Sequence, residues 1–146
     1  MPFMLNSCAG TSKITETGNI PKDTEWILIE IQTKPRPIII SRNSQEMRGF
    51  ENIYTLRFDE NRLSGIAAPN RYSAPYKLDK NQAITIQLIV ATLMAPILEP
   101  KNLKENEYFI YLQNAQKWNI SKGRLELHTT GKNNVKAVLI YDAIVP

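Results

Sequence analysis

Hydrophobic and polar residues alternate with a period of two along most of the chain after residue 23, which is the pattern of half-buried β-strands. The alternating runs are bounded by Gly, Pro, Asn and Asp, and they cover residues 26–32, 38–41, 54–58, 62–65, 76–78, 83–90, 125–128 and 135–144. They predict seven or eight short strands. In the first run, Ile27, Ile29 and Ile31 are predicted to share one face of the strand. In the run over residues 83–90, Ile84, Ile86 and Leu88 are predicted to do the same.

The period changes from two to 3.6 after Pro100. Residues 102–118 carry a stripe of Tyr108, Leu112 and Ala115 at helical spacing, continued by Tyr111 and Trp118, and Asn102 can cap the first turn. We therefore expect one late helix, with the Tyr108, Leu112 and Ala115 face packed on the sheet. The predicted fold is mostly β, an antiparallel barrel or pseudo-barrel of seven to eight strands whose open end or edge is covered by this helix.

Small residues, prolines and tyrosines gather around a single Asn in the stretch from Leu63 to Pro96. Gly and Ala let backbone pass close to backbone, and Pro fixes a bend without an amide donor. Asn70 is expected to hold a turn or bulge here through side-chain bonds to backbone. Tyr72 and Tyr76 are expected to pack against residues 92–96. A cluster of Tyr72, Tyr76, Tyr108, Tyr111 and Trp118 could line a pocket, but a helical stripe of this kind more often belongs to the core.

Residues 1–23 contain few large apolar groups and several Gly and Pro breakers, so we expect a disordered tether before a single domain at residues 24–145. Leu5-Asn6-Ser7-Cys8 is similar to the lipobox of bacterial lipoproteins, and a polar tether after Cys8 suits an anchored domain. Cys8 is accordingly predicted to be lipidated. The alternative is a free thiol on the terminal segment. Only a few residues precede Cys8, so lipidation requires a signal peptide longer than the segment printed.

Composition and charge exclude several classes of function. The net charge is +4, but the 18 basic residues are scattered and form no run or stripe, so nucleic-acid binding is not expected. His128 is the only histidine of the sequence and Cys8 is its only cysteine, which excludes metal sites built on several His or Cys ligands. His128 is interpreted as a solvent-facing strand residue. Glu99, Glu105 and Glu107 are assigned to favourable interaction with the helix dipole, and no catalytic residue, cofactor or metal is expected.

A series of short motifs occurs in a fixed order between residues 24 and 142. They are Trp26, Gly65–Ala68, Asn70-Arg71-Tyr72, Tyr76, Ile84-Thr85-Ile86, Thr92-Leu93-Met94-Ala95, Glu99, Glu107, Phe109, Leu112, Trp118 and Arg124–Leu127. In this order they resemble the META domain, or HslJ-like, family of bacterial envelope and heat-shock-associated proteins. Many members carry a Cys in each of two signature segments, where this chain has Pro69 and Pro96, so a thiol or disulfide role does not carry over.

The resemblance implies a lipocalin-like barrel with one helix, frequently on a lipoprotein, linked to stress or antibiotic tolerance and without an established enzymatic activity. It also implies a mainly structural role for the signature residues Asn70, Tyr72, Tyr76, Thr92 and Met94. We therefore expect a monomeric, non-enzymatic protein of the bacterial cell envelope, which contacts the membrane through a lipid anchor only and acts in stress or envelope homeostasis. The alternative is a lipocalin-like protein that binds a small apolar ligand between helix and sheet, or a partner protein.

Overall fold

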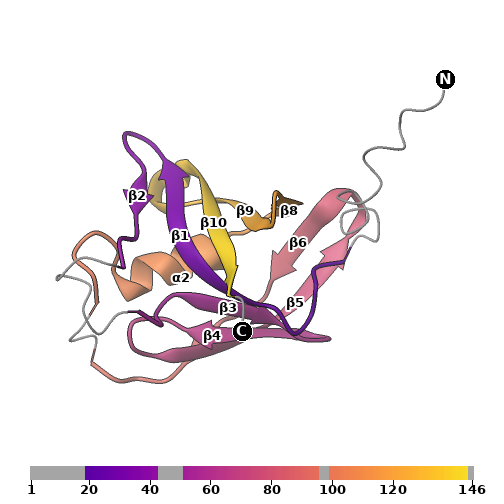
Figure 1. Ribbon diagram of the computed structural model, residues 1–146, viewed down its shortest axis with the longest axis horizontal. Coiled ribbons are helices and arrows are strands. Elements are labelled where there is room, and N and C mark those ends of the chain that lie inside the picture. The colour runs from indigo at the N-terminus through magenta and orange to yellow at the C-terminus, as the bar shows by residue number, and fades with distance from the viewer. Residues whose placement is uncertain (1–18, 43–50, 96–98, 145–146) are drawn as a thin grey trace.

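The computed structural model describes residues 19–42, 51–95 and 99–144 (Figure 1). Within these ranges the elements are β1 (Glu25–Thr33), β2 (Ile38–Ile39), β3 (Thr55–Phe58), β4 (Arg62–Ile66), β5 (Arg71–Asp79), the 3₁₀ turn η3 (Lys80–Gln82), β6 (Ala83–Ile86), β7 (Val90–Ala91), α2 (Glu105–Gln113), β8 (Lys117–Ser121), β9 (Arg124–Thr130), the 3₁₀ turn η4 (Lys132–Asn134) and β10 (Lys136–Ile144).

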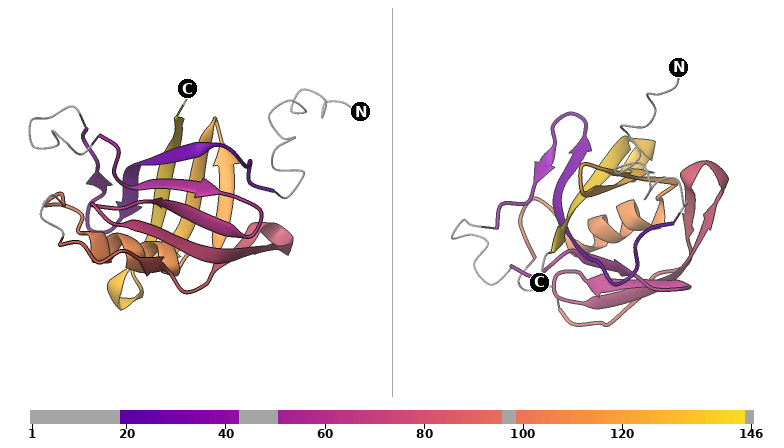
Figure 2. Two further views of the ribbon diagram at one scale, coloured as in Figure 1. Left: turned by 90° about the horizontal axis from the view of Figure 1, so that it is seen from below. Right: turned by 45° about the vertical axis from the view of Figure 1, so that its right-hand side comes forward.

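The strands form a closed antiparallel ring of eight, in the order β10-β9-β8-β6-β5-β4-β3-β1, with β2 and β7 outside the ring. The long pairing of β1 with β10 closes the ring. At the other junction, β6 and β8 pair only at Ala83 and Lys117 and then diverge. Figure 2 shows the strands β1, β3, β4 and β5 crossing in front of β8, β9 and β10, so the barrel is flattened into two crossed halves. The predicted mostly β barrel with one late helix is confirmed.

Strand β1 belongs to both halves of the barrel and bends between them at a register shift between Leu28 and Glu30. Because of this shift, the side chains that point inward are Trp26, Leu28 and Ile31. The prediction that Ile27, Ile29 and Ile31 share one face was wrong for this reason, since a bulge breaks the period-two pattern. Ile27 and Ile29 are only half-buried.

The helix is shorter than predicted, because α2 covers only Glu105–Gln113 and has Lys104 rather than Asn102 as its N-cap. Asn102 instead donates from its side chain to the carbonyl of Ile39. Trp118 belongs to β8, where its ring is buried and its backbone pairs with Leu127. The prediction that the helix runs to residue 118 was therefore wrong. Trp118 has helical spacing from Ala115, but aromatic residues are also common in strands. Its backbone pairing with β9 places it in a strand.

The helix fills the space where β6 and β8 diverge, and it lies within the outline of the ring (Figures 1 and 2). Its buried side chains include Tyr108 and Leu112, so the predicted packing of this face is confirmed for these two residues. Ala115 is also buried, but it follows the helix instead of belonging to its face. The side chain of Gln113 ties the helix to the strand edge. Its Nε2 donates to the carbonyls of Ile86 and Gln87, and its Oε1 accepts from the amide of Ile89.

Three further boundaries differ from the predictions. The run over residues 83–90 is broken after Ile86, and Leu88 is 76% exposed instead of sharing a buried face with Ile84 and Ile86. Strand β5 begins at Arg71, earlier than the predicted strand at residue 76. Ile20 is buried in the core, so the folded part begins before residue 24 and the predicted end of the tether is too late. Residues 1–18, including Cys8, lie outside the described residues.

Candidate functional site

Asn70 joins two loops of the chain through its side chain. Its Oδ1 accepts from the hydroxyl of Thr92 and the amide of Met94, each at 2.7 Å. Its Nδ2 donates to the carbonyl of Met94 at 3.0 Å and to Glu105 Oε1 at 2.7 Å. The residue is 4% exposed. The predicted side-chain bonds of Asn70 to backbone are confirmed, and they tie the residues before β5 to the residues after β7.

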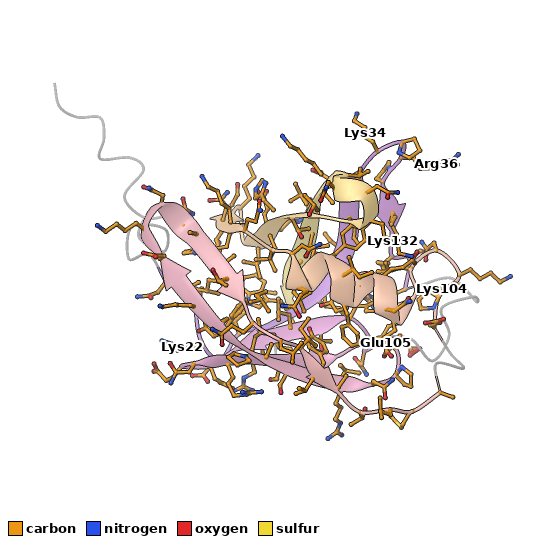
Figure 3. All side chains as sticks on the ribbon, turned by 180° about the vertical axis from the view of Figure 1, so that it is seen from behind. Lys22, Lys34, Arg36, Lys104, Glu105 and Lys132 are labelled. Atoms are coloured by element: carbon orange, nitrogen blue, oxygen red, sulfur yellow. The ribbon has the colours of Figure 1, made fainter. Side chains whose placement is uncertain are left out.

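Glu105 is the buried partner of this cluster and is the first residue of α2 (Figure 3). Its Oε2 accepts from the amides of Ala68 and Asn70 at 2.7 and 2.8 Å, on the two sides of a cis peptide bond between Ala68 and Pro69. Together with the Asn70 side chain, three N–H groups therefore point at one carboxylate. The N-terminus of a helix also favours negative charge. These donors and the helix end together offset the cost of burying Glu105.

A second polar row crosses the interior through three tyrosine hydroxyls. The oxygen of Tyr108 lies 3.0 Å from that of Tyr72 and 2.9 Å from that of Tyr141. Tyr72 donates to the carbonyl of Thr55 at 2.5 Å. Because each hydroxyl has one proton, Tyr108 must donate to Tyr72, and Tyr141 to Tyr108. The row therefore has a single direction, from β10 through the helix to β5 and β3.

Burial raises the pKa of Tyr108 to about 12, and it raises the pKa values of Tyr72 and Tyr141 well above the ordinary tyrosine range. At high pH the unfolded chain loses these protons first, so the folded state binds more protons and stability falls as the pH rises above 10. From Tyr108 alone we expect a loss of about 1 kcal/mol by pH 11. Urea unfolding at pH 8, 10 and 11 measures this loss.

Tyr108→Phe is the control for this pH dependence, because it removes the titrating hydroxyl and keeps the ring. The variant should be less stable at pH 8, since Tyr72 and Tyr141 lose a hydrogen-bond partner. Its stability should also decline less steeply between pH 10 and 11 than that of the parent. Equal declines in both proteins would contradict the assignment to Tyr108.

The predicted site residues fall into separate places. Asn70, Thr92 and Met94 meet in the Glu105 cluster. The ring of Tyr72 packs edge-on against Tyr108 and Phe109. Tyr76 is farther along β5, where its ring meets Phe58 edge-on and its hydroxyl donates to the carbonyl of Asp59. The contacts of Tyr76 differ from its predicted packing on residues 92–96, whereas Tyr72 lies beside the start of that segment, where its backbone pairs with Ala91 and it lines one hollow with Thr92. Pro96, the last residue of the predicted contact, lies outside the described residues.

The prediction that Glu105 interacts with the helix dipole misses its buried bonds to Ala68 and Asn70. A signal for these bonds is present in the sequence. Glu105 precedes Tyr108 and Leu112 by three and seven residues, so it shares their helical face, where an apolar residue would be expected. A carboxylate at such a position indicates a buried partner.

An open groove of about 1020 Å³ lies on the outer face of the sheet formed by β1, β10, β9 and β8. Its floor follows one row of paired residues across the four strands, namely Gln32, Val138, His128 and Lys117. The turn between β5 and β6 forms one wall, and Gln82 donates from that turn to the Trp118 carbonyl and the Asn119 side chain. Most of the lining residues have polar side chains, with the amides of Asn81, Gln82, Gln116 and Asn119, the ammonium groups of Lys34, Lys117 and Lys136 and the carboxylate of Glu126, but apolar atoms supply the larger part of the lining surface.

His128 lies in this groove and is half exposed, with its Nε2 3.6 Å from Oε1 of Glu126. It lies directly opposite Lys117 on the neighbouring strand. The interpretation of His128 as an outward-facing strand residue is confirmed by its place on the outer face of β9. In chemical terms, the amides of the groove offer hydrogen-bond donors and acceptors, and its three ammonium groups outnumber the carboxylate of Glu126. Among the described residues there is no group of three or more His, Cys, Asp or Glu that could hold a metal ion.

Comparison with known proteins agrees with this geometry. A model of the META domain matches residues 19–140. The chain belongs to the META domain family. The two segments that carry the predicted META signature are the ones that Asn70 joins through Thr92 and Met94. Among curated proteins, none matches the chain.

Two solved structures have the same fold as this META domain. One is the NMR structure of a protein from Burkholderia xenovorans, with a TM-score of 0.63 and 18% identity over 91% of this chain and 88% of that one. The other is the crystal structure of a DUF4847 family protein from Bacteroides vulgatus, with a TM-score of 0.53 and 15% identity over 81% of this chain and 90% of that one. At these identities the likeness concerns the fold alone.

Proposed function

We propose that this META-domain protein is a non-enzymatic binding protein of the bacterial cell envelope, held at a membrane by a lipid on Cys8, where it acts in envelope homeostasis under stress. We further propose that it takes its ligand in the outer groove. The observation that carries the proposal is the contrast between this groove of about 1020 Å³ and a barrel interior filled by side chains.

The filled interior argues against the lipocalin-like alternative, in which an apolar ligand lies between helix and sheet. Tyr54, Tyr108, Tyr141 and Trp118 are each at most 1% exposed, and they occupy the space that such a ligand would need. A ligand there would have to displace close-packed rings and break the tyrosine row, at a large cost in free energy. The outer groove needs no such rearrangement, and its amide and ammonium groups suit a polar ligand.

The non-enzymatic part of the proposal is supported by the hydrogen bonds of the buried polar groups, which join these groups to other parts of the fold. Asn70, Glu105 and the tyrosine row form hydrogen bonds with one another and with backbone, an arrangement that stabilises the fold and leaves these groups turned away from a substrate. The envelope part rests on the Leu5-Asn6-Ser7-Cys8 pattern. Among the described residues, none forms a helix long and apolar enough to cross a bilayer.

Native mass spectrometry of the protein from its own host tests both parts of the proposal. We expect a lipid-modified Cys8 at the start of the mature chain, and a co-purifying molecule bound to the folded protein. Val138→Trp should reduce the bound fraction at least tenfold, because it places a large ring on the floor of the groove. A soluble native protein with unmodified Cys8 would contradict the anchor.

Ile144→Trp is the matched control for the groove, because it introduces the same ring on the outer face of the same strand beyond the residues that line the groove. Ile144 is 37% exposed, so the change should be tolerated. The control should keep its ligand, and thermal unfolding should show that both variants are folded. A bound molecule that survives both substitutions, or a native protein with nothing bound, would contradict the groove.

A further inference from the structure

Exposed apolar side chains are concentrated in one short segment that the groove does not include. The described residues contain seven large hydrophobic side chains with high exposure, and four of them fall within residues 88–94. These four are Leu88 at 76%, Val90 at 54%, Leu93 at 98% and Met94 at 54%. We call them the apolar strip. Single exposed apolar residues are ordinary on protein surfaces, whereas a contiguous group marks an interaction site.

The apolar strip is held in place from the inside. Its first part is fixed by Ile89, whose amide donates to Gln113 and whose side chain packs against the core. Its middle pairs with β5, where Ala91 lies opposite Tyr72 and Val90 opposite Ser73. Its end is fixed by Met94, whose amide and carbonyl both bond to the buried side chain of Asn70. The exposure of the four side chains is therefore built into the fold.

No charged side chain belongs to the apolar strip itself. Residues 87–95 contain no charged side chain. The neighbouring exposed side chain on β5 is Arg71, whose backbone is bonded to Thr92. Arg71, Ser73 and Thr92 line a shallow hollow of about 290 Å³ beside Val90 and Ala91. The hydroxyl of Thr92 is bonded to Asn70 and that of Ser73 accepts from Arg62, so the cation of Arg71 is the group left for a phosphate. A cation next to protruding apolar side chains matches the boundary between the phosphates and acyl chains of a lipid layer.

We propose that the apolar strip is a membrane-docking edge, which inserts Leu88, Val90, Leu93 and Met94 into the interface of an anionic phospholipid bilayer while Arg71 contacts headgroup phosphate. A second copy of the chain fits the strip less well. Leu93 is 98% exposed and projects from the surface, and the strip consists of only four exposed apolar side chains. A stable protein interface needs a broad patch of roughly 800 Å² on each partner.

This inference deepens the proposed function, in which a lipid on Cys8 holds the chain at a membrane, but it stands on different residues. Eleven residue steps separate Cys8 from Asn19, the first described residue. A chain of that length spans at most about 40 Å when fully extended. A lipid at Cys8 would therefore keep the domain next to the bilayer, where weak contacts of the strip become effective.

The test uses the full chain with Cys8→Ser, prepared without lipid, so that the anchor plays no part in the result. Co-flotation with vesicles of 70% phosphatidylcholine and 30% phosphatidylglycerol measures binding, with pure phosphatidylcholine vesicles beside them. We expect the protein to float with the anionic vesicles and to float less with the neutral ones. Leu88→Asp with Leu93→Asp should reduce binding at least tenfold, and Arg71→Gln should remove the preference for anionic lipid.

The matched control is Ile39→Asp with Val135→Asp, which places the same charges on exposed apolar residues elsewhere, at 52% and 39% exposure. It should bind within twofold of the parent, and thermal unfolding should show that all variants are folded. No flotation of the parent, or equal flotation of strip and control variants, would overturn the proposal. A dimer in light scattering that the strip variant abolishes would also overturn it and assign the strip to a second copy. Lipidation of Cys8 is judged separately by the mass of the native protein, so either proposal can fail alone.

Discussion

Replacing Glu105 by Ala is expected to lower the free energy of unfolding by about 3–5 kcal/mol. The carboxylate accepts from the amides of Ala68 and Asn70 and from the side chain of Asn70, all of them buried. Removing it leaves three donors unsatisfied, and each buried donor without a partner costs about 1–3 kcal/mol. Urea denaturation at pH 7 measures the change.

Asn106→Ala is the control, because Asn106 is exposed and is the next residue of the same helix. It should change stability by less than about 0.5 kcal/mol. Asn70→Ala should cost about 1–3 kcal/mol, and the double variant should cost less than the sum of the two single changes, since they share one bond. Additive effects, or a Glu105→Ala protein as stable as the parent, would contradict a structural cluster and indicate a residue kept for binding.

Gly65→Ala is expected to destabilise the fold by about 3 kcal/mol, the upper end for an overpacked core site. A Cβ atom at this position would collide with the carbonyl oxygen of Thr55 and would lie 2.7 Å from the hydroxyl of Tyr72. That carbonyl accepts from the same hydroxyl, so the methyl group would push apart β3, β4 and β5 at the end of the tyrosine row. Thermal unfolding measures the loss.

Tyr72→Phe separates the two collisions, because it removes the hydroxyl and leaves the carbonyl of Thr55 in place. Combined with Gly65→Ala, it should cost less than the sum of the two single variants, since one collision is gone. Ser64→Ala, on the neighbouring residue, should stay within about 0.5 kcal/mol of the parent. A fully stable Gly65→Ala protein would show that the strands can separate there without loss.

The fold class was predictable because its signal is local. Period-two runs mark strands and a 3.6 period marks the helix, and both patterns arise from which side chains face the core of their own element. The errors came where one element met another. The bulge between Leu28 and Glu30 changes which side chains of β1 are buried. Trp118 lies in a strand instead of the helix because its backbone pairs with β9.

The sequence by itself determined most of the strands, the late helix, their assembly into one barrel, and Asn70 as the anchor of its loops. Only the tertiary structure decided what Asn70 binds, because Glu105 lies 35 residues away along the chain and reaches it through the packing of α2 on the barrel. The outer groove and the apolar strip were likewise decided in three dimensions. The groove requires four strands paired in register. The strip is exposed because the predicted strand over residues 83–90 ends at Ile86. Local sequence records the preference of each residue, but contacts between distant residues depend on how the ring closes.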